Sequence, residues 1–483
     1  MSAATTSEPR PSADASVGEA APPVPAVDTY PRGLYLHVLV VSLVGGFAVL
    51  GWFVLYEWLD KLIWENAYVV AHAWMFPVVC LPFSLLVGLL VKYARAPSNL
   101  DGSMLDSLTG DVATLRWKDL PATVATSLAS LFSGAVLGPE GAIGNIAGKI
   151  AALYCDLLRI PADRRPRLVF AAVASGYNGL LENPIFAAVL GAEVAETRKQ
   201  GLATLPASLI GGAVGYGIFK VLHESGFLGF LHLPPVQSYL WWYALLMVPL
   251  ALAGLVLTLL TAAFMRLATA FFGRLADRVV LRALVAGAIF SVVGVLAPVM
   301  MFSGETQAQT VIKGAAGYGV AVLLVMAVGK LALLAVGFRS GFLGGPTFPL
   351  IFASTAVALA LNLAFPGVPV AIFVAGVMAG AVFALFRTPL MVVLLTGFML
   401  DMGTTMVALI VLAMATVMIA MPPLQARMAA RRAGRPPGAS PAGARAAEAG
   451  VDGGAGLDAA RDGGAVRALG LTVDGGHDAT RER

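Results

Sequence analysis

The sequence predicts an all-α polytopic membrane protein made of two repeats that contain broken helices. The chain has 483 residues, of which 58% are hydrophobic and only 12% are charged, a balance that soluble domains do not show. Many stretches reach the roughly 20 apolar residues that a membrane-spanning helix needs. Several stretches are interrupted by Gly or Pro, and two of these interruptions recur in the same order further along the chain.

The apolar stretches define the predicted spans. They are too long and too evenly apolar for the short alternating strands of a membrane barrel. The net charge of +4 is small and lies in loops and tails, so it indicates membrane orientation and no nucleic-acid partner. Cys80, Cys155 and the five histidines are scattered, which predicts no disulfide framework, no metal site and no cofactor. The clearest stretches are 34–56, 74–91, 239–264, 284–302, 320–338 and 391–421.

Residues 31–423 are expected to form one transmembrane domain, with repeat halves at about 34–222 and 238–421. Residues 1–30 and 424–483 are rich in small, polar and charged residues and predict disordered tails. No signal peptide precedes the first apolar stretch. Arginines cluster at 159–167, 266–282 and 427–435. The positive-inside rule therefore places both tails in the cytoplasm, for a multi-pass protein of the cell (inner) membrane.

The stretch Gly138-Pro139-Glu140-Gly141 lies inside a long apolar region. A carboxylate at membrane depth costs about 2.5–3.5 kcal/mol on insertion scales and is a functional candidate by default. Pro139 favours the first turn of a helix, and a helix beginning here directs unpaired N–H groups at the space before it. Such a helix end binds anions. Glu140 is then a built-in anion that leaves when a free anion arrives, or, in the plainer alternative, only a helix cap.

Two pairs of breaks indicate an internal repeat. SGAVLGPE at 133–140 matches SGFLGGPT at 340–347, and the motifs lie 207 positions apart. Pro184 and Pro389 begin a second matching pair 205 positions apart. Interrupted spans at corresponding positions of two halves mark the central site of many transporters. The site is therefore expected between the helix starts at Pro139 and Pro346, with an acid, Glu140, in one half only.

These motifs resemble those of the CLC family of chloride channels and proton-coupled chloride exchangers. The chain looks like a divergent bacterial-type member without CBS domains, over about Leu34 to Arg431. GPEG at 138–141 resembles the G-[KR]-E-G-P stretch whose Glu is the family's external gate, and GPTFP at 345–349 resembles its G-x-F-x-P stretch. The resemblance implies two inverted halves whose helix N-termini converge on dehydrated anions, and a homodimer with one pore per subunit.

The resemblance also implies a set of anion-binding residues beside the gate Glu140. Asn99 stands where the family has a coordinating Ser, and Gln425 stands where it has a coordinating Tyr. Both amides can donate to an anion. The gate motif has Pro139 for its basic residue and Ala142 for its proline. The implied anion-binding set is Ser98, Asn99, Gly138, Gly141, Ala142, Gly345, Pro346, Thr347, Phe348 and Gln425.

Proton coupling is left open by the residues. Family exchangers carry an internal Glu ten residues after the proline matched by Pro184, and that position is Val194 here. Val194 favours uncoupled, channel-like flux. A shift of the alignment by one residue makes Glu193 the proton acceptor. Otherwise Glu193, near Arg198 and Lys199, reads as a solvated helix end.

We therefore expect transport of small inorganic anions, chloride foremost, gated by Glu140, as a channel or a proton-coupled exchanger in the lipid bilayer. Two alternatives stay open: a fluoride exporter of the same family, and an inverted-repeat transporter of an organic anion. An enzyme is not expected, because Ser340 has no His on a nearby span to serve as a base. The glycine-rich stretches Leu205–Leu222 and Val370–Phe386 predict flat subunit contacts in a homodimer.

Overall fold

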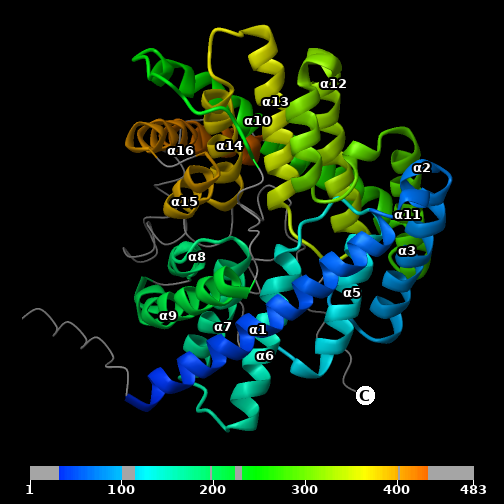
Figure 1. Ribbon diagram of the computed structural model, residues 1–483, viewed down its shortest axis with the longest axis vertical. Coiled ribbons are helices and arrows are strands. Elements are labelled where there is room, and N and C mark those ends of the chain that lie inside the picture. The colour runs from blue at the N-terminus through cyan, green and yellow to red at the C-terminus, as the bar shows by residue number, and fades with distance from the viewer. Residues whose placement is uncertain (1–31, 100–114, 196–197, 223–230, 401–402, 433–483) are drawn as a thin grey trace, which may run out of the picture.

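The computed structural model describes residues 32–99, 115–195, 198–222, 231–400 and 403–432 (Figure 1). The predicted tail 1–30 lies outside these ranges, as do residues 433–483 of the predicted tail 424–483 and positions 100–102 of the motif that follows Asn99. Within the described ranges, eight helices are long and apolar enough to cross a membrane. The predicted fold class, an all-α polytopic membrane protein of inverted repeats, is confirmed.

The two halves contain helices that correspond in position. Helices α6 and α13 are both 18 residues long, and their first residues lie 207 positions apart. In Figure 1, α5 to α9 lie below and α13 to α16 lie above. The first half comprises α1 (Arg32–Ile63), α2 (Ala67–Ala71), α3 (Met75–Tyr93), η2 (Trp117–Asp119), α5 (Leu120–Phe132), α6 (Glu140–Leu157), α7 (Arg165–Leu180), α8 (Phe186–Val194) and α9 (Arg198–Leu222). The second half comprises α10 (Tyr243–Gly273), α11 (Val279–Leu296), η4 (Pro298–Met300), α12 (Glu305–Ser340), α13 (Thr347–Ala364), α14 (Val370–Phe386), α15 (Pro389–Met399) and α16 (Thr404–Arg432).

Glycines allow the same close helix crossing in each half. Helix α1 packs on α7, and α10 packs on α14. A Cβ atom at Gly46 would overlap Ser175 of α7, and one at Gly254 would overlap the backbone of Val377 in α14. Backbones can approach this closely in a membrane only where the residue is small.

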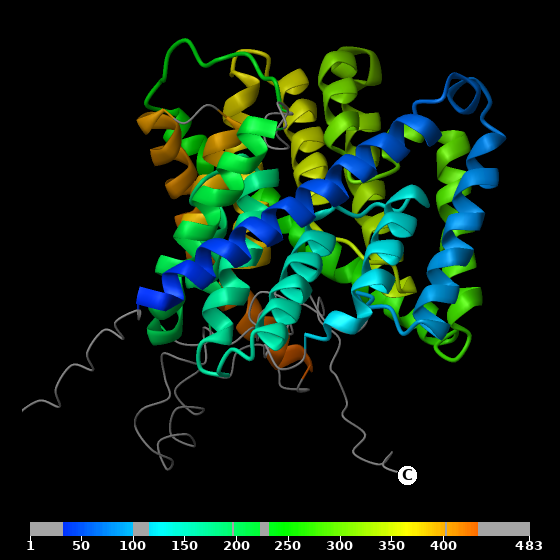
Figure 2. The same ribbon diagram turned by 60° about the horizontal axis from the view of Figure 1, so that its bottom comes forward.

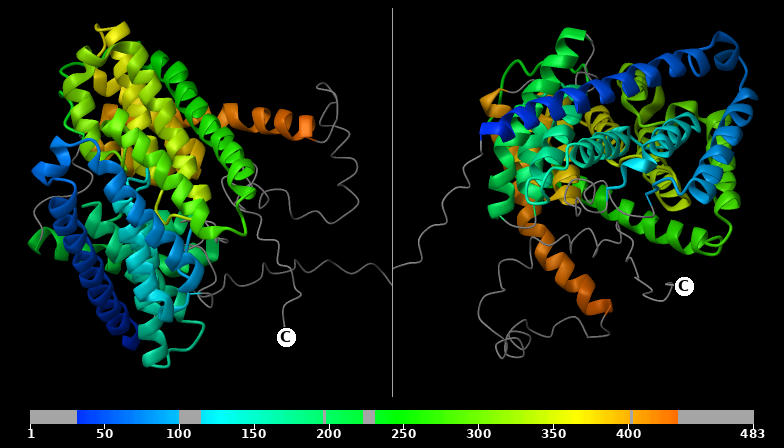
Figure 3. Two further views of the ribbon diagram at one scale, coloured as in Figure 1. Left: turned by 90° about the vertical axis from the view of Figure 1, so that its right-hand side faces the viewer. Right: turned by 90° about the horizontal axis from the view of Figure 1, so that it is seen from below.

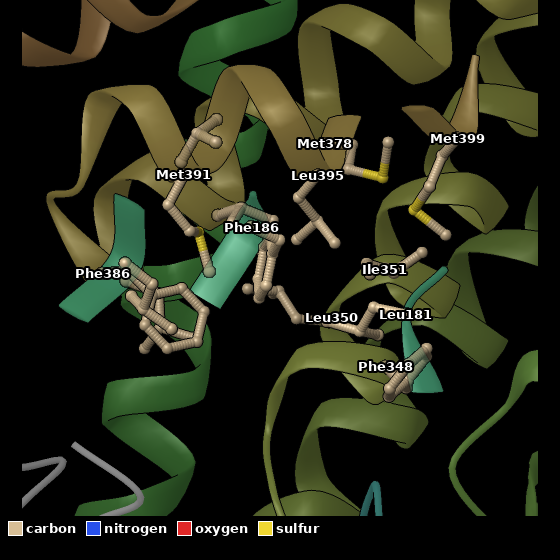
Figure 4. Close-up of a cluster of buried hydrophobic side chains, with 14 of the residues drawn as sticks. Leu181, Phe186, Phe348, Leu350, Ile351, Met378, Phe386, Met391, Leu395 and Met399 are labelled. Atoms are coloured by element: carbon tan, nitrogen blue, oxygen red, sulfur yellow. The ribbon is translucent and has the colours of Figure 1, made fainter. Parts of the chain in front are cut away.

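The apolar core joins the two halves. Leu181 and Phe186 of the first half meet side chains of α13, α14 and α15 (Figure 4). The stretch Val370–Phe386, predicted as a flat subunit contact, is helix α14, and 16 of its residues from Ala371 to Phe386 are buried. The prediction was wrong there, because a helix that is apolar on all sides packs inside a protein. Helix α9 does keep outward-facing residues, such as Leu209 and Val221.

The C-terminal helix differs from the predicted boundaries. The apolar stretch 391–421 forms two helices, α15 and α16. Helix α16 continues past residue 423 to Arg432, and its last turns leave the bundle (Figure 3). Pro422 and Pro423 are exposed at this exit, so their rings displace no packed neighbour. The start of α1 and the end of α16 lie on the same side of the bundle (Figure 2).

Candidate functional site

The two repeat-related breaks pair with each other. The backbone N–H of Gly138 donates to the carbonyl of Gly345, and the N–H of Gly345 donates to the carbonyl of Gly138, both at 2.8 Å. This antiparallel bridge brings the first turns of α6 and α13 face to face. The sequence repeat thus becomes a single junction inside the bundle, where two helix N-termini meet.

Glu140, the first residue of α6, lies at this junction. Its Oε1 accepts a hydrogen bond of 2.8 Å from the N–H of Thr347, the first residue of α13. The side chain is 3% exposed, and Oε2 is buried with no hydrogen-bond partner in the described part of the chain. A charge-assisted bond to a helix N-terminus is among the stronger hydrogen bonds. The sequence predicted that Glu140 and a free anion compete for the N–H groups at the start of α6. In the structure, the Glu140 side chain binds an N–H at the start of α13, in the opposite half.

The glycines of both motifs make room for this carboxylate. A Cβ atom at Gly138 or at Gly345 would overlap the side chain of Glu140. A Cβ at Gly141 would lie 2.7 Å from the backbone carbonyl carbon of Gly344, closer than real contacts allow. Only hydrogen fits at Gly138 and Gly345 while the carboxylate occupies the junction, and at Gly141 the backbone of Gly344 leaves room for hydrogen alone.

Two polar side chains hold the broken backbones in place. The hydroxyl of Tyr177 in α7 donates to the carbonyl of Glu140 at 2.5 Å. The Asn99 side chain binds the backbone of Gly344 through Nδ2 at 2.9 Å and Oδ1 at 3.3 Å. Asn99 therefore braces the second break, and Ser98 beside it is buried. Sequence reasoning missed Tyr177, although an aromatic hydroxyl among glycines at 175–179 was a usable signal.

Several residues implied as anion ligands have their donors engaged elsewhere. The N–H groups of Gly138 and Gly345 bind each other's carbonyls, and that of Ala142 binds the Pro139 carbonyl at 2.9 Å. Pro346 has no N–H to donate. The side chain of Phe348 belongs to the apolar cluster of Figure 4. Thr347 is thus the backbone donor that the structure places on the carboxylate.

Gln425 lies on α16 and has a buried Nε2 with no partner among the described residues. It comes one helical turn after Met421, whose sulfur accepts from Arg387 at 3.3 Å. It therefore lies near the C-terminal end of α14, and no hydrogen bond among the described residues joins its Nε2 to the Glu140 junction.

A buried charge pair near the junction also escaped the sequence analysis. Lys330 of α12 is fully buried, donates to the carbonyl of Met301 at 2.7 Å and lies 4.5 Å from the ring centroid of Phe352. Glu305, at the start of α12, interacts electrostatically with both Lys330 and Glu140. Lys330 lies inside the apolar stretch 320–338, so the cost of a charged side chain in an apolar span could have marked it, as it marked Glu140.

Glu193 caps the start of another helix, as Glu140 caps α13. Its Oε1 and Oε2 accept from the N–H groups of Leu390 at 2.8 Å and Met391 at 2.9 Å, at the start of α15. Glu193 lies near the end of α8 and is partly exposed, and its contact with α15 was not predicted from the sequence. An acid of the first half again neutralises the N-terminus of a helix in the second half.

Replacing Glu193 by Ala is expected to lower the free energy of unfolding by about 1–3 kcal/mol, because two N–H groups of α15 lose a charged acceptor. Glu193→Gln keeps one carbonyl acceptor and is expected to lose about half of that. Thermal unfolding of the purified protein in detergent measures the effect. The control is Asp163→Ala, since Asp163 is 76% exposed. Equal melting temperatures for Glu193→Ala and Asp163→Ala would contradict the capping role.

Comparisons with known proteins agree with this architecture. A family model described as voltage gated chloride channel matches residues 83–421. The H(+)/Cl(-) exchange transporter ClcA of Citrobacter koseri is 24% identical over 352 residues, covering 70% of this chain and 73% of the relative. The structure of a slow cyanobacterial Cl-/H+ antiporter superposes with a TM-score of 0.66 at 21% identity, covering 81% of this chain and 96% of the other. That of a CLC-type fluoride/proton antiporter gives 0.65 at 18% identity, covering 81% and 95%.

Proposed function

The chain belongs to the voltage gated chloride channel family, and from this premise we propose that it moves small inorganic anions, chloride foremost, across the inner membrane. The multi-pass helical architecture supports this role. The relative from Citrobacter koseri is an H(+)/Cl(-) exchange transporter, which supports both an anion and protons as the transported species. The hydroxyl of Ser340, the nucleophile candidate that the sequence offered, donates to the carbonyl of Val336 within its own helix.

One observation carries the proposal, the 2.8 Å hydrogen bond from the Thr347 N–H to Glu140 Oε1. The carboxylate occupies a helix N-terminus, which is a place where a mobile anion binds. An arriving anion and the carboxylate compete for the same donor and the same dipole end. Protonation of Glu140 removes its charge and favours the anion. Glu140 is then the gate, and this conformation is the one in which the gate is closed.

The test is a reversal-potential measurement on the purified full chain in lipid bilayers under crossed chloride and pH gradients. We expect a current whose reversal potential follows the chloride gradient. A reversal potential that also follows the pH gradient identifies proton-coupled exchange. Fluoride and a small carboxylate, substituted for chloride, test the two alternatives. Flux of the carboxylate alone would contradict inorganic anion transport.

Glu193 is the candidate internal proton acceptor. Val194 at the position of the family's internal Glu favours uncoupled flux, whereas the antiporter relatives favour coupling. Glu193 is the neighbouring acid and lies at the start of α15. If the chain pumps protons, Glu193→Gln should stop proton movement while chloride flux continues; coupled movement that persists in this variant would exclude Glu193.

Both tails are proposed to be cytoplasmic. The start of α1 and the end of α16 lie on one side of the bundle (Figure 2), and the arginines at 427–435 flank the last span. By the positive-inside rule this side faces the cytoplasm. Single cysteines placed in 1–30 or 433–483 should resist a membrane-impermeant thiol reagent in intact cells and react after lysis. The native Cys80 and Cys155 are buried, so background labelling is low. Labelling of either tail from outside would overturn this topology.

A homodimer with one pore per protomer is also proposed. Apolar side chains face outward just before α8 and on α9, α15 and α16, and include Ile185, Leu209, Leu390 and Ile419. Such a face packs against lipid or against a second copy of the chain. Chemical crosslinking in lipid vesicles should yield a species of twice the monomer mass. Monomer alone, both in detergent and in lipid, would rule the dimer out.

A further inference from the structure

The last turn of α6 carries apolar side chains that face outward. Leu157 is 76% exposed, and Leu158, the residue after the helix, is 47% exposed. One turn earlier, the hydroxyl of Tyr154 is hydrogen-bonded to Nδ1 of His37 in α1 at 2.8 Å, and Leu36 beside His37 is also exposed. The outward surface of α1, a helix long and apolar enough to cross a membrane, therefore continues onto the end of α6. This end lies on the side of the bundle where α1 begins (Figure 2).

Two exposed arginines follow these leucines in the turn between α6 and α7. Arg159 comes directly after Leu158 and has a left-handed backbone, with φ of 51°. Arg164 precedes α7, and its side chain is 44% exposed. It pairs with its chain neighbour Asp163 at 4.0 Å, and an exposed pair of this kind contributes little to stability. Both guanidinium groups, which are always charged, can therefore reach a ligand outside the bundle.

Hydrogen bonds hold this turn in one shape. The carboxylate of Asp156 in α6 accepts from Trp117 Nε1 at 3.1 Å and from Arg165 Nη1 at 2.8 Å. The Nε of Arg165 donates to the carbonyl of Ile160 at 3.0 Å, and the N–H of Ile160 donates to the carbonyl of Cys155 at 2.8 Å. Arg165, in the first turn of α7, thus ties the middle of the turn to α6. A turn fixed in this way loses little conformational entropy when it binds a ligand.

We propose that the turn between α6 and α7 binds the headgroup of an anionic phospholipid in the cytoplasmic leaflet. Arg159 and Arg164 bind the phosphate, since guanidinium groups match its oxygens, and Leu157 and Leu158 enter the apolar layer beside it. The turn holds two exposed arginines and one exposed acid, Asp163, so its net positive charge favours an anionic lipid over a zwitterionic one. This inference goes beyond anion transport and does not depend on it. The bound lipid holds the cytoplasmic end of α6, the helix that begins at Glu140.

The test is native mass spectrometry of the full chain in detergent, titrated with phosphatidylglycerol or with phosphatidylethanolamine. We expect tighter binding of phosphatidylglycerol. Arg159→Asn combined with Arg164→Gln should weaken that binding about 25-fold, because each basic side chain near an anionic lipid contributes about fivefold. Asn tolerates the left-handed backbone, so the turn is kept. The matched control, Arg274→Gln combined with Arg278→Gln, removes two exposed arginines between α10 and α11 and should bind phosphatidylglycerol as the wild type does.

If the double variant fails to fold, Arg164→Gln alone should weaken binding about fivefold. Equal weakening in the control would mean a general attraction of basic side chains to anionic lipid and would overturn the site. Equal binding of the two lipids would overturn it too, as would binding of inorganic phosphate as tight as that of phosphatidylglycerol. A changed ratio of monomer to dimer in the double variant, with unchanged lipid binding, would mean that a second copy of the chain covers this face. The readout is lipid binding, so absence of chloride flux would defeat the proposed function and leave this inference standing.

Discussion

Replacing Glu140 by Gln is expected to speed anion flux about tenfold at neutral pH and to remove its dependence on external pH. The Glu140 carboxylate holds the Thr347 N–H at 2.8 Å, and a hydrogen bond to a charged group contributes about 1.5–3 kcal/mol. A neutral amide holds it less strongly, so an anion competes better for the donor. Protonation neutralises the wild-type carboxylate, so wild-type flux should rise as external pH falls. Gln is neutral at every pH, and its flux should stay flat.

The measurement is chloride efflux from liposomes over a range of external pH. Glu65→Gln is the matched control, because Glu65 is exposed on the turn after α1 and should behave as wild type. Thr347→Ala keeps the backbone donor and should change flux without changing its pH dependence. A folded Glu140→Gln protein with the wild-type pH response would reduce Glu140 to a structural cap.

Replacing Gly345 by Ala is expected to destabilise the junction and to reduce flux strongly. The added Cβ would overlap the Glu140 side chain, and overpacking of this kind costs about 1–3 kcal/mol. Thermal unfolding and chloride efflux measure the two effects. Gly367→Ala is the control, since a Cβ there meets nothing within 4 Å.

The cause can be isolated by a double-mutant cycle. If the clash with the carboxylate is the reason, Gly345→Ala should cost less in a Glu140→Ala background, with a coupling of about 0.5–3 kcal/mol typical of touching residues. Additive losses would mean that Gly345 matters for the backbone bridge to Gly138 and not for the gate.

Glu140 and Glu193, both in the first half, each cap a helix of the second half. Glu140 binds the first N–H of α13, and Glu193 binds the first N–H groups of α15. Each carboxylate satisfies donors that a helix start leaves open, and each links the two halves of the chain. Glu140 differs in having a second oxygen with no partner in the described chain. If Glu140 is the gate, as proposed, this oxygen without a partner is expected to make the Glu140 contact easier to exchange for a free anion than the Glu193 contact.

The sequence by itself determined the fold class, the repeat and the gate candidate. Each rests on a local rule: the length an apolar helix needs to span a membrane, the recurrence of Gly and Pro breaks at one spacing, and the cost of a lone carboxylate among apolar residues. Glu140 stands out for the last reason without any knowledge of its neighbours.

Only the tertiary structure decided which distant groups these residues meet. Spacing shows that a helix start has free N–H groups, but the partner of Thr347 lies 207 positions away, and that of Met391 lies 198 away. Because their partners are also distant in the sequence, three further features could not be predicted. These are the hydrogen bond of Asn99 to Gly344, the burial of α14 and the contact of Arg387 with Met421. Local propensity acts within a few residues, whereas donors and acceptors far apart in the chain are matched only when packing brings their helices together.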